Sequence, residues 1–146
     1  MPLNNPFMGA GDVPSYQMSG IPFVTSSQAG EVGTTPIRVE FPNVSRFVVV
    51  HNPSSNVLRI GFTENGVSDK GGSVSGSIHE QNADHSNYFI LSGNQSTGRL
   101  ELRVKDLFFL RDGGANAGFS IVAGITPVRR SMFPTLTGSQ GYLGIG

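Results

Sequence analysis

The clearest alternation of apolar and polar residues lies in residues 99–110, RLELRVKDLFFL. Leu100, Leu102 and Val104 alternate there with charged residues, a period of two that predicts a strand with one face in water. The four residues after Asp106 are all apolar, which predicts a strand covered on both faces. We therefore expect the chain to pass here from one sheet into a second, facing sheet.

Shorter segments with the same pattern occur along most of the chain. They predict strands at residues 21–28, 37–41, 45–52, 58–62, 88–91, 99–110 (one strand or two) and 119–126, with a short edge strand around Val74 and Ile78. Gly, Pro, Asn and Ser, the residues that turns select, separate these segments. About eight short strands in one domain predict an all-β sandwich, most often a single jelly roll.

The two ends of the chain have a different composition. Residues 1–20 contain Pro2, Pro6 and Pro14 among several glycines, which disfavours both a helix and a central strand. Residues 127–146 are also rich in Gly and Pro, yet they carry apolar side chains that are poorly suited to free solution. We expect extended arms at 1–20 and 127–146, flanking a single jelly-roll domain at 21–126.

Composition narrows the classes of function. Charged residues make up 14% of the 146 residues, about half the usual share, and the formal net charge is +0. Direct nucleic-acid binding requires a basic face, which such a sequence does not predict. No apolar run is long enough for a membrane-spanning helix, and the first residues do not follow the layout of a secretory signal. We expect a cytosolic product, or a viral one assembled in the cell.

Candidate chemistry is sparse in this sequence. The densest set of metal-ligand residue types is His79, Glu80, Asp84 and His85, but its spacing is not that of the helical HExxH motif. We interpret it as a solvated loop or an interface contact, with a divalent-ion site as the less favoured hypothesis. The sequence has no nucleophile elbow and no cysteine, and its histidines do not lie along strands as a cupin-like enzyme requires. We predict no enzyme activity, cofactor or metal.

Three segments carry a resemblance to a known family. Residues 47–62, VKDLFFLRDGG at 104–114 and FSIVAGIT at 119–126 resemble single jelly-roll capsid proteins of large icosahedral double-stranded DNA viruses of eukaryotes. The nearest likeness is to the penton (vertex) proteins, with minor capsid proteins beside them. The resemblance implies a homopentamer at the fivefold vertices that contacts the major and minor capsid proteins. It also implies a place in the virion, after assembly in the host cell cytoplasm.

The capsid hypothesis makes certain apolar strand faces and the end of the chain candidates for contact with neighbours. These candidates are Val48, Val50, Leu107, Phe108, Phe109, Leu110, Arg129, Arg130, Phe133 and Tyr142. The adjacent arginines fit either an acidic neighbour or a solubilising pair. The alternative function is a minor (cement) protein, or a receptor- or carbohydrate-binding sandwich module on a particle surface. The absence of tryptophan weakens the case for sugar stacking.

Overall fold

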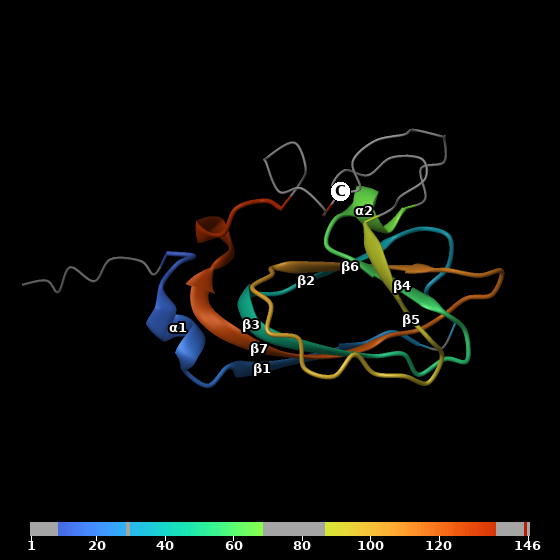
Figure 1. Ribbon diagram of the computed structural model, residues 1–146, viewed down its shortest axis with the longest axis horizontal. Helices are drawn as coiled ribbons and strands as arrows, with labels where there is room; N and C mark the ends of the chain where they lie inside the picture. Colours follow the sequence, from blue (N-terminus) through green and yellow to red (C-terminus); the bar gives the residue numbers. More distant parts are fainter. Residues whose placement is uncertain (1–8, 29, 69–86, 137–144, 146) are drawn as a thin grey trace, which may run out of the picture.

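Two antiparallel sheets face each other in the computed structural model, which describes residues 9–28, 30–68, 87–136 and 145. Seven strands lie in this part of the chain, and its helices are short. Figure 1 shows the sheets as two layers, with β1, β3 and β7 in one and β2, β4, β5 and β6 in the other. The predicted all-β sandwich is therefore confirmed.

The first sheet has the order β1-β7-β3, so its central strand is the last one in the sequence. Its strands are β1 (Ile21–Ser26), β3 (Asn43–His51) and β7 (Ser120–Arg129). Both neighbours run antiparallel to β7, and Phe23 and Val48 lie opposite Ala123 from either side. These three side chains share the face that turns toward the second sheet.

The second sheet has the order β2-β6-β4-β5. Its strands are β2 (Ile37–Glu40), β4 (Leu58–Gly61), β5 (Tyr88–Leu91) and β6 (Asp106–Arg111). Phe109 of β6 lies opposite Ile60 of β4 and Ile37 of β2, which aligns an apolar row on the inner face.

The hydrophobic core fills the space between the sheets. Its largest fully buried side chains are Phe41, Leu58, Ile60, Leu107, Phe109 and Ile121. The ring of Phe109 stacks on that of Phe119, with ring centroids 4.3 Å apart. Phe23 meets Phe41 edge-on at 5.2 Å. Removing this apolar surface from water, at about 25 cal/mol per Å², is the main force that holds the sheets together.

The single segment predicted at 99–110 divides between the two sheets. Residues 96–104 run beside β3, where Leu100 and Val48 exchange backbone hydrogen bonds of 2.8 and 2.9 Å. After Lys105, β6 continues in the facing sheet. The expected passage from one sheet to the other is thus present.

The first half of that segment is nevertheless not a regular strand. The Ser45 hydroxyl donates to the Leu102 carbonyl at 2.9 Å and accepts from the Val104 N–H at 3.1 Å. These side-chain bonds replace ladder bonds, and the register of β3 is irregular around Ser45. The alternation of Leu102 and Val104 correctly identified the inward face but could not reveal this competing hydroxyl.

A short helix covers part of the outer face of the second sheet. This helix, α2 (Glu64–Val67), begins after Thr63, whose hydroxyl accepts from the Gly66 N–H at 2.8 Å. Val67 is fully buried over Gly61, which has no side chain to obstruct it. The outward residues of β6 are thus partly covered by the same chain. The edge strand expected around Val74 and Ile78 lies outside the described residues.

The first segment also departs from the expected extended arm. Helix α1 (Val13–Gln17) forms there with Pro14 in its first turn, where a missing N–H costs no hydrogen bond. The Tyr16 hydroxyl donates to the Ala10 carbonyl at 2.7 Å, and the Arg103 guanidinium lies over its ring. Burial raises the pKa of Tyr16, against a smaller lowering by Arg103.

At the other end, β7 continues to Arg129, past the predicted domain boundary at 126, and leads into η1 (Arg130–Met132). Val128 and Phe133 are buried with Val44 in a second, smaller apolar cluster. Residues 127–136 therefore pack on the sandwich.

Gly124→Ala tests the close packing of the first sheet. A methyl group at Gly124 would overlap the Phe47 ring, coming within 2.7 Å of its Cδ1, while Gly20 packs closely against the Gly124 backbone. We expect a loss of about 1–3 kcal/mol in the free energy of unfolding, measured with urea. Gly113→Ala is the control, because nothing lies within 4 Å of the added methyl group. Equal urea midpoints for the two variants would contradict this packing.

Candidate functional site

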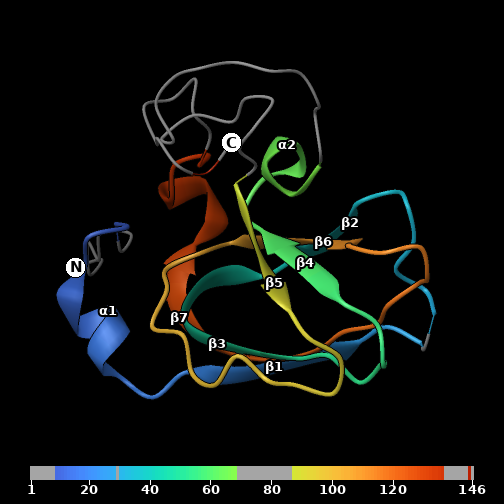
Figure 2. The ribbon, with the colours of Figure 1, turned by 45° about the vertical axis from the view of Figure 1, so that its right-hand side comes forward.

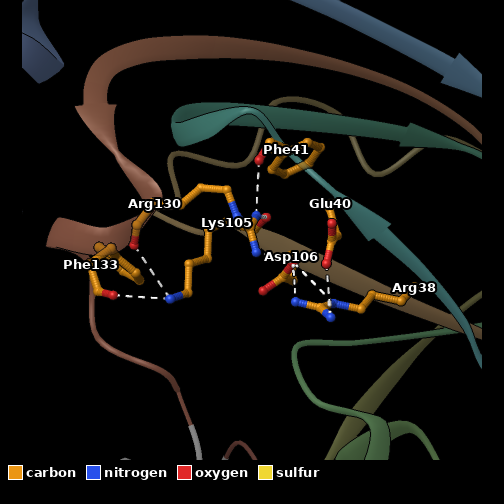
Figure 3. Close-up of polar contacts among 7 residues, drawn as sticks. All are labelled: Arg38, Glu40, Phe41, Lys105, Asp106, Arg130 and Phe133. Carbon is orange, nitrogen blue, oxygen red and sulfur yellow. Dashed lines mark hydrogen bonds and ion pairs between the residues drawn. The ribbon is translucent and has the colours of Figure 1, made fainter.

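A charged cluster joins the two sheets where β6 begins (Figure 3). The Oδ1 atom of Asp106 accepts from Arg130 Nη2 at 2.9 Å and from Arg38 Nη2 and Nε at 3.2 and 3.3 Å. Arg38 belongs to β2, whereas Arg130 opens η1 after β7. The Asp106 side chain is only 14% exposed, so water screens these ion pairs less than it would on an open surface.

The Arg130 guanidinium also satisfies backbone carbonyls at the ends of the strands. Its Nη1 donates to the Phe41 carbonyl, just after β2, at 2.9 Å. The same nitrogen donates to the Lys105 carbonyl, just before β6, at 2.5 Å. One side chain thus holds the start of η1 against both β2 and β6.

Lys105 contributes a positive charge to the same cluster. Its ammonium donates to the Phe133 carbonyl at 3.0 Å and to the Arg130 carbonyl at 3.5 Å. An ammonium has three N–H donors, so these two bonds leave one for another acceptor. Within the described residues, no carboxylate lies within ion-pair distance of Lys105.

A cleft of about 310 Å³ opens beside the charged cluster. Its lining residues come from the start of α2, from β2 and the start of β6, and from the segment after η1. Figure 2 shows α2 and the end of β7 at the same side of the sandwich. It is lined by Arg38, Lys105, Asp106 and Phe108, by Phe62, Thr63, Glu64 and Asn65, and by Thr135 and Leu136. Phe62, Phe108 and Leu136 give it an apolar part beside the cations. This combination suits binding of a group that is both apolar and charged.

Metal ligation has little support in the part of the chain that the structure describes. No group of three or more His, Asp and Glu side chains there is arranged to hold an ion. His79, Glu80, Asp84 and His85 lie outside the described residues. Among the described residues, no helix is both long and apolar enough to cross a membrane.

Six of the ten predicted interface residues are buried. Val48, Val50, Leu107 and Phe109 are at most 1% exposed and lie between the two sheets, so they cannot meet a neighbour in this fold. Leu110 and Phe133 are buried as well. The expectation of an interface at these positions is therefore wrong. An apolar run alone does not distinguish cover by a facing sheet from cover by a partner.

The remaining predicted residues have separate positions. Phe108 is half-buried in the cleft, and Arg130 lies in the charged cluster beside it. Arg129 is exposed at the end of β7. Tyr142 lies outside the described residues.

Sequence reasoning missed two features of the surface. One is the cleft that Lys105 and Asp106 line. In the sequence these two charged residues only separate two apolar segments, and nothing there indicates a cleft. The other is the pair Val24 and Val122, which lie opposite each other on the outer face of the first sheet. Val122 stands between the inward residues Ile121 and Ala123, so its apolar character on the outer face was a usable indication.

Searches against protein-family profiles, curated proteins and solved structures found no match to this chain.

Asp106→Asn tests the charged cluster. The change removes the charge that faces Arg38 and Arg130 while keeping the shape of the side chain, so we expect unfolding to become about 2 kcal/mol easier. Glu40→Gln is the matched control, because Glu40 also pairs with Arg38 (2.8 Å) but is 57% exposed. Its expected effect is about 0.5 kcal/mol or less. Urea denaturation of both variants checks the difference, and a larger effect at Glu40 would contradict this assignment.

Proposed function

We propose that this protein is a structural subunit of an icosahedral viral capsid, of the penton type. Five copies form a ring at each vertex and contact the neighbouring major and minor capsid proteins. The role is structural, not enzymatic, in a virion assembled in the host cell cytoplasm. The resemblance of residues 47–62, 104–114 and 119–126 to single jelly-roll capsid proteins supports this proposal, as do the strand order and one exposed face.

The strand order supports a jelly roll. When residues 96–104 are counted as a strand beside β3, the first sheet becomes β1-β7-β3-(96–104) and faces β2-β6-β4-β5. A double-sheet sandwich of eight strands is the jelly-roll architecture, which capsid, lectin and cupin domains share. The strand order therefore agrees with the capsid proposal. It agrees equally with the other functions of this architecture, because one fold serves many functions.

The outer face of the first sheet is the observation that carries the proposal. Val24, Val122 and Val49 are in register across its three strands. Val24 is 66% exposed and Val122 is 44% exposed. Pro22 lies opposite Gly124 on the same face of β1 as Val24, and it is exposed as well. A contiguous apolar patch of this kind marks an interaction surface.

The size of this face favours assembly through several contacts. Six residues at about 3.3 Å and three strands at about 4.8 Å give a flat area of roughly 300 Å². A stable interface buries about 800 Å² per partner. One such contact is too small alone, but closing a ring gives each subunit two neighbours. Pentamers are therefore expected to form cooperatively, with few smaller species.

Val24→Lys tests whether this face mediates assembly. We expect the unchanged protein to give a discrete pentamer at rising concentration in native mass spectrometry. The lysine places an exposed charge on the apolar face, so Val24→Lys is expected to remain monomeric. Ile90→Lys is the control, because Ile90 is equally apolar and 57% exposed but belongs to the other sheet.

Circular dichroism of both variants establishes that they remain folded. Unchanged assembly of Val24→Lys would exclude this face as the contact. A monomer at every concentration, or a discrete trimer, would contradict the penton proposal.

A further inference from the structure

We infer that the cleft between α2 and the start of β6 binds a small carboxylic acid with an aromatic or aliphatic body. The inference concerns a binding site inside one subunit, so it does not depend on assembly. It combines three features of the described residues: an ammonium without a carboxylate partner, a balanced set of charges around it, and an apolar surface within the same cleft.

The first feature is the Lys105 ammonium. Its two hydrogen bonds go to the carbonyls of Phe133 and Arg130, which fix its position but do not neutralise its charge. Lys105 also lines the cleft. A carboxylate there would accept the third N–H and form a charge-assisted bond, the stronger kind of hydrogen bond.

The second feature is the charge balance of the surrounding cluster. Arg38 and Arg130 are matched by Glu40 and Asp106, which are joined to them by ion pairs of 2.8 to 3.2 Å. The charges of these four side chains sum to zero, so the positive charge of Lys105 is not balanced by them. Glu64, the remaining acid that lines the cleft, is exposed in the first turn of α2, where its charge is screened by water.

The third feature is the apolar part of the cleft. Phe62, Phe108 and Leu136 are each half-buried, so they retain surface that a ligand can remove from water. The volume of about 310 Å³ lies at the lower end of the range of about 300–1,000 Å³ for ligand sites. The ligand is therefore small, and its body meets the apolar side chains while its carboxylate meets Lys105.

A pair of probe compounds separates the two halves of this recognition. N-acetyl-L-phenylalanine has an aromatic ring and a carboxylate, and its amide keeps the ring but replaces the carboxylate with an uncharged carboxamide of similar size. We expect the acid to shift the backbone amide NMR signals of Thr63, Asn65 and Phe108, with a dissociation constant of about 1 mM. The amide is expected to bind about tenfold more weakly. Added NaCl is expected to lower the affinity for the acid and to leave the affinity for the amide unchanged.

Protein variants then assign the charge to Lys105. Lys105→Met keeps the aliphatic stem and removes the ammonium, so we expect the acid to bind about tenfold more weakly and no better than the amide. Arg99→Met is the control, because it removes one positive charge at an exposed ion pair with Glu101, away from the cleft. Its affinity for the acid is expected to equal that of the unchanged protein.

The comparison of acid and amide on the unchanged protein remains decisive even if Lys105→Met does not fold. Equal binding of the two compounds would overturn the inference. Signal shifts confined to other faces, or no binding of the acid up to 10-fold above the expected constant, would also overturn it. An equal loss of affinity in Lys105→Met and Arg99→Met would exclude a specific contact with Lys105.

Discussion

The carboxylate of Asp106 joins three parts of the chain that are distant in sequence. Arg38 reaches it from β2 and Arg130 from the turn after β7, so one oxygen connects the second sheet to the end of the first. Arg130 then occupies the carbonyls at the adjoining ends of β2 and β6, and Lys105 fixes the turn after β7. The cleft lies beside this junction, because Arg38, Lys105 and Asp106 line it together with residues that follow Phe133, whose carbonyl Lys105 binds.

Most of the fold could be predicted from alternation alone. The inward faces of β4 and β7 follow directly from apolar residues two apart, since successive side chains of a strand point to opposite faces. The failures came from side chains that compete with the backbone pattern. Ser45 interrupted pairing beside Leu102, and Pro14 began a helix in a segment where prolines indicated an extended arm.

The candidate site was much less predictable than the fold. Its cations, acids and aromatic side chains come from β2, β6, the approach to α2 and the segment after η1, so no short motif contains them. The interface prediction failed for a different reason. Val48 and Phe109 belong to apolar runs, but their exposure depends on a second sheet that local sequence cannot place. The exposure of Val122 was easier to predict, because Val122 is an apolar residue at an outward position, where the alternation of its strand predicts a polar one.

The register of β1 against β7 determines how the domain would respond to tension. Ile21, the first residue of β1, lies opposite Ile125, near the end of β7, so the two terminal segments leave the sandwich at the same end. Hydrogen bonds between antiparallel strands run across the strands. A pull between residues 9 and 136 would load α1 and the Arg130 junction first, and once these had given way it would break the β1–β7 hydrogen bonds one after another from that end. Mechanical resistance in this domain must come from what anchors the ends, namely the contacts of α1 and the Arg130 junction, and not from the length of the β1–β7 ladder.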